Sequence, residues 1–361
     1  MNIKVNSFFI VIIFTALFFF HFSCKLDENP AEGEFLIRYI TNDIDTISFW
    51  NKRSIYIIKK TDFKVNKILI IDAGVVVKFA PQTSMTVTDS GYLSCQGTPA
   101  NPVIFTSLYD SKFGVKANDA SYPAPKAGNW NSIYVKSKIP SSFNYCVFSY
   151  GGGDISKSTL IIDSVYADIM HCTFRDNKGG TIDESTGALN ASKALSKTNI
   201  EKCTFYNNEL PLSIDCNINL GKENIFQNPE DSLQKNSFNA IAVQSSNAIT
   251  QNVFWEENKI PYIILGKKLE ISGAAYIALY NGVVLKFKEG CSLVLPDGAN
   301  SLRNQNGRGV VFTSINDDNY MGDTRNDHNN VRAKEDDWSV KILAFDDAFE
   351  WEYVFFAKKE K

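Results

Sequence analysis

Short apolar segments rich in β-branched residues, separated by turn residues, dominate the chain from Ser54 onward. Such runs are typical of β-strands, in which successive side chains point to opposite faces. Long amphipathic windows typical of helices are scarce, and the segment 188–197 is the best short candidate. The pattern predicts an all-β fold, with early strands at 55–58, 68–71, 75–79 and 85–88.

One large block of sequence occurs twice. The segment 74–79 returns as 282–287, an offset of 208 residues (282 − 74). Trp130 returns as Trp338 at the same offset. Internal repetition of this kind is typical of solenoid architectures. We therefore predict an internal duplication, with repeat blocks 54–153 and 262–356 on either side of middle coils 154–261.

A smaller repeat runs through the middle of the chain. A cysteine and a phenylalanine two residues later recur, and the phenylalanines of this pattern and its looser echoes lie 21 to 31 residues apart. Intervals of this size fit the coils of a solenoid. Because strand side chains alternate, the cysteines and phenylalanines would face the interior, and adjacent coils would lie about 4.8 Å apart. The units are 145–148, 171–174 and 202–205, with echoes at 224–226 and 252–254.

The unit x-Cys-Thr-Phe-x-x-Asn resembles the repeats of right-handed parallel β-helices of the pectin-lyase-like fold. The first repeat block is also similar to secreted β-helix proteins in its Gly-Val-x-Val-Lys-Phe strand (74–79), Phe-Thr-Ser strand end (105–107), Trp130 strand and Tyr-Gly-Gly turn (150–152). The resemblance covers 54–356. It implies a right-handed parallel β-helix solenoid, a single elongated domain over 54–361, and it indicates no particular activity.

The amino-terminal segment predicts export and a lipid anchor. A cationic start precedes an apolar run at 8–20, which is too short to span a bilayer and suits a signal peptide. Ser23 and Cys24 follow, and they resemble a bacterial lipoprotein cleavage box, although His21 departs from the usual leucine. The resemblance implies a signal peptide over 1–23, lipidation of Cys24, and a tether and N-terminal cap over 24–53. The alternative is an ordinary signal peptide with an incidental cysteine.

The residues after Cys24 bear on the destination of the chain. The segment 25–28 looks like the lysine-plus-acidic tag of lipoproteins on the outer face of the outer membrane. We therefore expect an outer-membrane, lipid-anchored protein that faces the cell exterior. The net charge of −3 gives no reason to expect a nucleic-acid partner, which would require a clustered basic face.

Two kinds of interior residue follow from the coil repeat. Six cysteines remain after Cys24, without a CxxC pair that would indicate a zinc site. Parallel coils would hold their Cβ atoms about 4.8 Å apart, farther than the ~3.8 Å of a disulfide, so buried thiols are favoured over disulfides. Asn177 and Asn208 each follow a ladder phenylalanine by three residues. We expect them at coil corners, in the left-handed conformation that asparagine tolerates and in a hydrogen-bonded ladder.

Outward-facing residues of the middle coils form the candidate binding face. The alternation would expose aromatic and cationic side chains that could stack on sugar rings or bind polar ligands. No catalytic residue is assigned, because the acidic residues of the middle coils do not recur in step with the ladder. Trp130 and Trp338 are interpreted as packing residues. The predicted binding residues are Tyr145, His171, Arg175, Lys202 and Tyr206.

An acidic loop in the second repeat block is the candidate metal site. Closely spaced carboxylate and amide oxygens suit calcium, although the spacing does not match an EF-hand. A solvated, turn-rich loop is the alternative, because Asp and Asn readily bond their own backbone. The predicted ligands are Asp317, Asp318, Asp323, Asn326 and Asp327.

These observations favour a non-catalytic, lipid-anchored cell-surface protein that acts in adhesion or glycan binding. A polysaccharide lyase or glycoside hydrolase is the first alternative, and it would need at least two carboxylates with Arg or Lys in one groove. A subunit of a surface complex is the second, with a protein partner that covers the carboxyl-terminal end of the solenoid, where 358–361 is charged.

Overall fold

The computed structural model describes residues 35–114, 123–184, 186–304, 309–328, 332–342 and 354–360, which belong to a compact unit from Phe35 to Lys361. Within these residues the fold is all-β, as predicted, with two short 3-10 helices at Ile182–Glu184 and Gly298–Ser301. The weak helical candidate at 188–197 is wrong, because β16 occupies Leu189–Lys193 and buries alternate side chains. In the described part of the chain, no helix is long and apolar enough to cross a membrane.

Three long sheets hold most of the strands. The seven-stranded sheet contains β1 (Leu36–Ile40), β3 (Ser54–Ile58), β6 (Val76–Phe79), β9 (Val103–Ser107), β12 (Cys146–Ser149), β15 (Thr173–Arg175) and β18 (Thr204–Tyr206). The six-stranded sheet contains β2 (Ser48–Trp50), β5 (Ile68–Asp72), β8 (Tyr92–Gln96), β11 (Ser141–Asn144), β14 (Ala167–Met170) and β17 (Asn199–Glu201). The ten-stranded sheet contains β4 (Asp62–Val65), β7 (Ser84–Val87), β10 (Ile133–Val135), β13 (Leu160–Asp163), β16, β19 (Leu212–Asp215), β20 (Ile241–Gln244), β22 (Tyr262–Ile264), β25 (Val284–Phe287) and β28 (Val311–Ser314).

Two smaller sheets complete the second half of the chain. The first contains β21 (Val253–Trp255), β24 (Ile277–Leu279) and β27 (Leu302–Asn304). The second contains β23 (Lys268–Glu270), β26 (Ser292–Leu295), β29 (Trp338–Ile342) and β30 (Ala357–Glu360).

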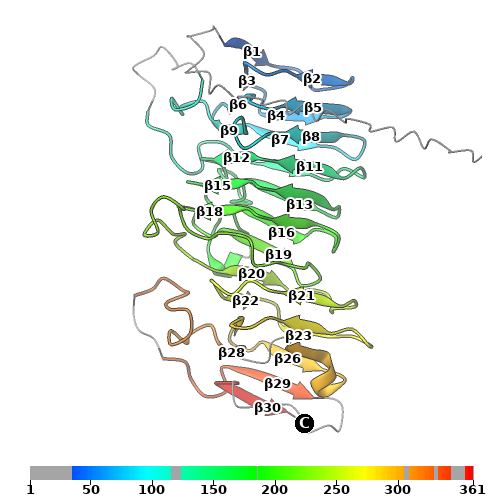
Figure 1. Cartoon of the computed structure of the whole chain (residues 1–361), viewed down its shortest axis with the longest axis vertical. Coiled ribbons are helices and arrows are strands. Elements are labelled where there is room, and N and C mark those ends of the chain that lie inside the picture. Colours follow the sequence, from blue (N-terminus) through cyan, green and yellow to red (C-terminus); the bar gives the residue numbers. More distant parts are fainter. Residues whose placement is uncertain are drawn as a thin grey trace, which may run out of the picture. The chain divides into compact units, whose positions relative to one another are not determined.

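The strands stack in chain order, as Figure 1 shows. From β2 to β16, a strand pairs in parallel with the third strand after it, as β3 does with β6 and β6 with β9. Successive strands therefore belong to three different sheets in turn. A chain that returns to the same sheet once per coil gives the pairing of a β-solenoid, with which this fold is consistent.

The pairing pattern of the first block recurs in the second. The order β3–β6–β9 corresponds to β22–β25–β28, and β4–β7–β10 corresponds to β23–β26–β29. However, β3, β6 and β9 lie in the seven-stranded sheet, whereas their counterparts continue the ten-stranded sheet. This shift arises in the middle coils, where β19 pairs directly with β20 and no strand of another sheet lies between them in the chain.

Strands also begin before Ser54. β1 lies in the range predicted as tether and N-terminal cap, and it pairs with β3 so that Leu36 is opposite Ser54 and Ile40 opposite Ile58. β2 pairs with β5 in the same range. The described fold therefore starts close to Phe35.

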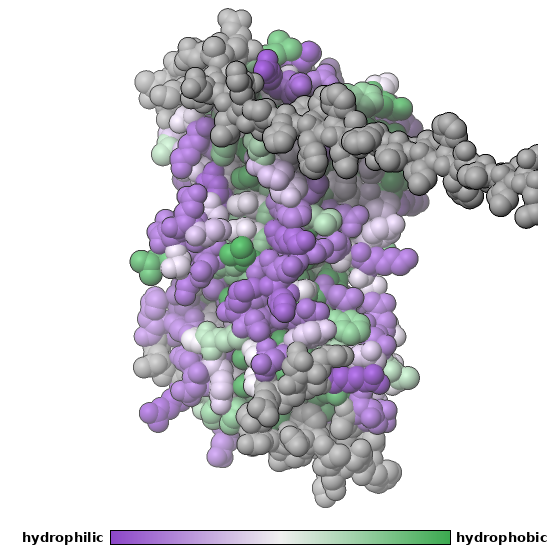
Figure 2. All heavy atoms as spheres, viewed as in Figure 1, coloured by the Kyte–Doolittle hydropathy of each residue, from purple (hydrophilic) through white to green (hydrophobic). Residues whose placement is uncertain are grey.

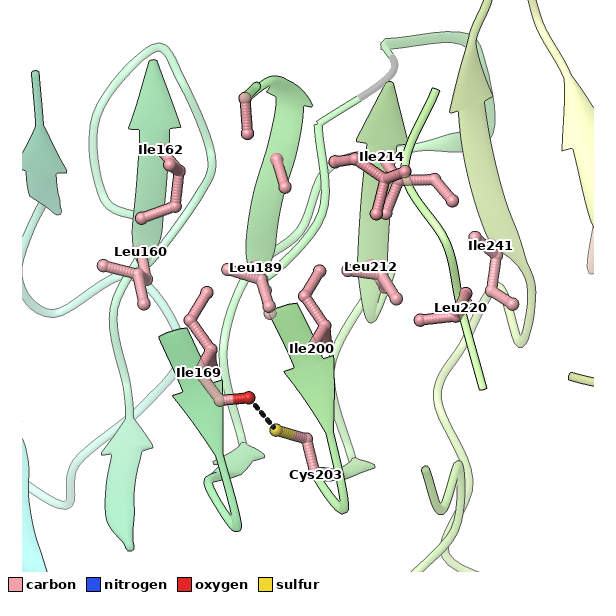
Figure 3. Close-up of a cluster of buried hydrophobic side chains, with 14 of the residues drawn as sticks. Leu160, Ile162, Ile169, Leu189, Ile200, Cys203, Leu212, Ile214, Leu220 and Ile241 are labelled. Carbon is pink, nitrogen blue, oxygen red and sulfur yellow. Dashed lines mark hydrogen bonds between the residues drawn. The ribbon is translucent and has the colours of Figure 1, made fainter. Parts of the chain in front are cut away.

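The interior consists of stacked apolar side chains. As predicted, the cysteines and phenylalanines of the repeat units face inward, and the rings of Phe148 and Phe174 stack with centroids 4.7 Å apart. The alternate residues, such as Val147 and Thr173, are half-buried. Figure 3 shows leucine and isoleucine side chains from several coils that meet inside the stack. The tryptophans pack as interpreted, with Trp130 stacked on Phe79 and Trp338 on Phe287.

The six cysteines of the described residues are free and buried. Cys203 donates a weak hydrogen bond to the carbonyl of Ile169 at 3.4 Å (Figure 3). Burial raises the pKa of Cys146, Cys172 and Cys203 well above the usual value, so these groups remain thiols rather than nucleophilic thiolates.

We predict that, in a chain carrying Cys24→Ser, these six thiols do not react with a disulfide reagent such as DTNB while the chain is folded. In denaturant all six should react, because only burial protects them. Counting released thionitrobenzoate in both conditions checks this. Fewer than six reactive thiols in denaturant would instead indicate that disulfides had formed. The cysteines concerned are Cys95, Cys146, Cys172, Cys203, Cys216 and Cys291.

An asparagine ladder runs along one corner of the coils, as predicted. The side-chain amide of Asn177 donates to Oδ1 of Asn208 at 3.0 Å, and that of Asn208 donates to Oδ1 of Asn236 at 2.9 Å. The expectation of a left-handed conformation at these asparagines is wrong. The positive φ falls one residue earlier, at Asp176 (56°) and Asn207 (55°), because the chain must turn before the buried asparagine can point inward.

Candidate functional site

The predicted binding residues form two separate groups. Tyr145, His171 and Lys202 occupy equivalent left-handed corners, with φ of 47°, 55° and 55°, one or two residues before β12, β15 and β18. The rings of Tyr145 and His171 stack with centroids 4.4 Å apart. Nζ of Lys202 lies 3.7 Å from a carboxylate oxygen of Glu201 and 3.7 Å from one of Glu223. These residues therefore form a partly exposed column at one coil corner.

Arg175 and Tyr206 lie at the opposite end of the same strands, where they are neighbours across β15 and β18. Arg175 follows His171 by four residues, and four steps along an extended strand correspond to about 13 Å. Arg175 is only 9% exposed, and its guanidinium pairs with Asp176 at 2.5 Å and lies 5.9 Å from the centre of the Tyr150 ring. Burial raises the pKa of Tyr206. Arg175 is thus largely committed to its protein neighbours.

The predicted calcium loop is organised around a buried lysine. Lys286 is fully buried, and Nζ donates to the carbonyls of Asp317 and Gly322, both at 2.9 Å, and to the hydroxyl of Thr324 at 2.6 Å. Three acceptors saturate an ammonium group. Burial lowers the pKa of Lys286 to about 8, against the opposing effect of Asp318 and Asp317. The ammonium therefore provides a positive charge inside the acidic loop.

The loop carboxylates also bond within the loop. Oδ2 of Asp317 accepts from the Thr313 hydroxyl at 2.6 Å, and Asp323 accepts from the backbone of Asp327 and His328. Burial and the neighbouring Asp323 raise the pKa of Asp318. Among the described residues, no group of three or more His, Cys, Asp or Glu side chains is placed to hold a metal ion. Calcium binding by the loop, including Asn326, stays a prediction.

A buried lysine also holds the corresponding loop in the first block. Lys78 is 2% exposed and donates to the carbonyl of Asp110 at 2.8 Å, while the hydroxyl of Thr106 donates to Asp110 at 2.7 Å. Lys78 and Lys286 are related by the offset of 208 residues (286 − 78). Both lysines fasten the loop that follows a Phe-Thr-Ser strand to the outer face of its sheet. In the described structure, both acidic loops are therefore held against their strands by a buried lysine.

Sequence reasoning missed a polar groove on the middle coils. Its volume is about 710 Å³, and it extends over the ends of β13, β16, β19 and β20. Figure 2 shows hydrophilic side chains gathered over the middle of the displayed face, at the level of β16 and β19. Most of the residues that line it carry amide, hydroxyl or charged side chains, notably Asn190, Ser192, Lys193, Asp215, Asn217 and Gln244.

Hydrogen bonds fix the polar groups of this groove before any ligand binds. Oδ1 of Asp215 accepts from the backbone of Asn217 at 2.9 Å, and Oδ1 of Asn217 accepts from the backbone of Thr250 at 3.2 Å. Asn190 accepts from the Ser192 hydroxyl at 2.7 Å. Side chains held in this way lose little conformational freedom on binding. The groove is therefore a preorganised array of donors and acceptors.

Glu184 and Asp215 both line the groove, together with Lys193. Glu184 pairs with Lys157 at 2.5 Å, and this partner holds the pKa of Glu184 below its usual value. A general acid of a glycosidase needs a raised pKa, so Glu184 in this state is poorly suited to donate a proton. Asp215 is 9% exposed and is bonded to Asn217. Both groove carboxylates are therefore engaged by protein partners.

A sequence signal for this groove did exist. Polar residues follow apolar strands in the segments 190–193, 215–219 and 244–247. Each segment alone is typical of a turn. Only the coil register indicates that these segments converge on one surface.

Comparisons with known proteins give no family for this chain. No protein-family model, no curated protein and no solved structure matches it. Cys24, the predicted lipidation site, lies outside the described residues.

Proposed function

We propose that this chain is a lipid-anchored, cell-surface protein with a right-handed parallel β-helix that binds polysaccharide without cleaving it. The observation that carries the proposal is the preorganised polar groove over β16, β19 and β20. Amide, carboxylate and hydroxyl groups are suited to the dense hydroxyl groups of a glycan, since each can donate to or accept from a sugar hydroxyl. The predicted export signal and Cys24 support display at the outer membrane.

The coil geometry supports a linear glycan as ligand. Neighbouring coils lie about 4.8 Å apart, which is close to the length of one pyranose residue in an extended chain. Polar residues at the ends of consecutive strands therefore recur at intervals that can meet consecutive sugars. The half-exposed Tyr145 and His171 pair adds a second aromatic surface on which a sugar ring could stack.

We expect Asn217→Ala combined with Gln244→Ala to weaken retention of the full-length chain on its polysaccharide at least fivefold. Each hydrogen bond lost to a buried ligand group costs about 0.5–1.5 kcal/mol, so two lost contacts correspond to roughly a 5- to 150-fold loss of affinity. A panel of immobilised polysaccharides, followed by measurement of dissociation constants on the retained one, provides the measurement.

The matched control is Asn199→Ala combined with Gln96→Ala, because these residues lie on β17 and β8 of the six-stranded sheet. Retention by the control pair should equal that of the unsubstituted chain. Equal affinity of the groove variant and the control would contradict the proposed site. Failure of the unsubstituted chain to bind any polysaccharide would contradict the proposed function.

Cleavage is the second candidate function, and the two groove carboxylates with Lys193 are the observation that favours it. A polysaccharide lyase or glycoside hydrolase would release new reducing ends or unsaturated products from the retained polymer. Asp215→Asn would abolish that release if Asp215 were catalytic. Release of new ends that depends on Asp215 would overturn the non-catalytic proposal.

A further inference from the structure

Exposed apolar side chains concentrate at the amino-terminal end of the described unit. Tyr39 is 58% exposed, Ile47 61% and Phe49 57%, all in or beside β1 and β2. The other exposed large apolar residues are spread from Ile139 to Leu233. We call this cluster the amino-end surface, and it consists of Phe35, Leu36, Ile37, Tyr39, Ile47 and Phe49.

Basic residues accompany this surface. The segment 35–60 carries five lysines or arginines and two aspartates, a formal charge of +3 (5 − 2), although the whole chain carries −3. Nζ of Lys59 lies 4.2 Å from the centre of the Tyr39 ring. Lys60 pairs with Asp43, which leaves the basic excess on Arg38, Lys52, Arg53 and Lys59. Aromatic residues beside lysine and arginine are typical of surfaces that contact lipid headgroups.

The edge of β1 limits how deeply this surface could enter a bilayer. Among the described residues, β1 is an edge strand of the seven-stranded sheet, so the backbone groups on its outer side have no strand partner. Such groups need water or headgroups to satisfy their hydrogen bonds, because the hydrocarbon core offers none. Contact is therefore restricted to the headgroup level.

We propose that the amino-end surface docks onto an anionic lipid bilayer, so that the β-stack stands on the membrane with this end inward. The inference rests on the lipid anchor of the proposed function. Phe35 lies eleven residues after Cys24 (35 − 24), and eleven steps along the chain span at most about 40 Å. Such a tether holds the amino-end surface near the bilayer at a high effective concentration.

Depth-dependent fluorescence quenching tests this contact. Phe49→Trp, made in the full-length lipidated chain, is reconstituted with vesicles of phosphatidylcholine and about one-third phosphatidylglycerol that contain brominated lipid. Leu233→Trp is the matched control, because Leu233 is 88% exposed and lies far along the chain. After subtraction of the signal of the unsubstituted chain, we expect strong quenching and a blue shift for Phe49→Trp, and neither for Leu233→Trp.

Charge reversal gives an independent readout. Cys24→Ser removes the anchor, and binding of this soluble chain to the same vesicles reports docking alone. Adding Lys52→Glu and Arg53→Glu should weaken this vesicle binding at least tenfold, because basic residues near an anionic surface are attracted to it and acidic residues are repelled. The matched control is Lys197→Glu combined with Lys267→Glu, two exposed lysines outside the amino-end surface and outside the groove, and it should leave vesicle binding unchanged.

Equal quenching of both tryptophans, or vesicle binding that is insensitive to charge reversal, would overturn the docking proposal. A blue shift of the Phe49→Trp emission that grows with protein concentration in the absence of vesicles would show that the surface joins two chains, and it would overturn the docking proposal. If mass spectrometry of the membrane-extracted chain shows no acyl groups, the lipid anchor is contradicted. The docking proposal is still tested by the Cys24→Ser chain. The two failures are therefore distinguishable.

Discussion

Replacing Asn208 with alanine should lower the free energy of unfolding by about 4 kcal/mol. Asn208 is 1% exposed, and its amide donates to the carbonyl of Phe174 and to Oδ1 of Asn236, both at 2.9 Å. Oδ1 also accepts from the backbone and side chain of Asn177 at 3.1 and 3.0 Å. Each buried group left without a partner costs about 1–3 kcal/mol, and relaxation of the corner reduces the sum.

Urea denaturation followed by circular dichroism measures this change. Asn199→Ala is the matched control, because Asn199 is half-buried on β17, and it should cost less than about 0.5 kcal/mol. A loss of unfolding free energy at Asn208 no larger than at Asn199 would contradict a structural role for the ladder.

Phe148→Leu should lower the free energy of unfolding by less than Asn208→Ala does. The apolar replacement leaves the polar groups bonded and mainly loses ring stacking and side-chain volume.

Replacing Lys286 with methionine should destabilise the second block by about 3–5 kcal/mol. Methionine matches the length of the lysine stem but cannot donate, so the carbonyls of Asp317 and Gly322 lose their buried partner. The nearby Asp318 would also lose the positive charge that lowers its pKa. Thermal unfolding and proteolysis of the loop provide the measurements.

Lys288→Met is the matched control, since Lys288 is two residues away, 39% exposed, and paired with Asp183 at 2.9 Å. A surface pair of this kind is worth about 0–1 kcal/mol. Lys78→Met should destabilise the first block in the same direction as Lys286→Met. A cost at Lys286 no greater than at Lys288 would contradict the buried-lysine account of the acidic loop.

The lowered pKa of Lys286 also gives a pH signature. Its folded-state pKa is about 8, below the ordinary value of about 10.4, so the unfolded chain binds more protons between these values. Unfolding free energy therefore rises with pH in this window, by about 1.5 kcal/mol from pH 8 to 9.5 for this one group. The rise should be absent from Lys286→Met. An identical pH profile in both chains would show that the ammonium is not the group responsible.

The asparagine ladder illustrates how far local sequence determines this fold. The recurring Cys-x-Phe and the asparagine three residues later specify a strand, its buried face and a corner. These features depend on side-chain alternation and on residue type, and both are readable within a few residues. The sequence predicts the left-handed conformation at the asparagine itself, whereas it occurs one residue earlier, at Asp176 and Asn207. The side-chain amide of the asparagine must reach the next coil, and this requirement places the turn before it.

The lysines illustrate the opposite case. The sequence presents Lys78 and Lys286 as alternating residues of apolar strands, and the acidic loop as a free cluster of ligands. Only the fold brings Lys286 to Thr324, 38 residues away. The lysine ammonium therefore lies inside the acidic loop. A contact at that separation depends on the path of the coil, which strand periodicity does not specify.

The sequence by itself determined the all-β class, the coil repeat, the duplicated blocks and the inward-facing ladders, because each follows from local alternation and from spacing along the chain. The tertiary structure alone decided the shift of the second block to another sheet, the division of the predicted binding residues into two groups, and the polar groove. These features depend on which strands become neighbours. Because the coil length varies between 21 and 31 residues, spacing along the chain does not specify which strands pair, and the pairing is known only from the folded structure.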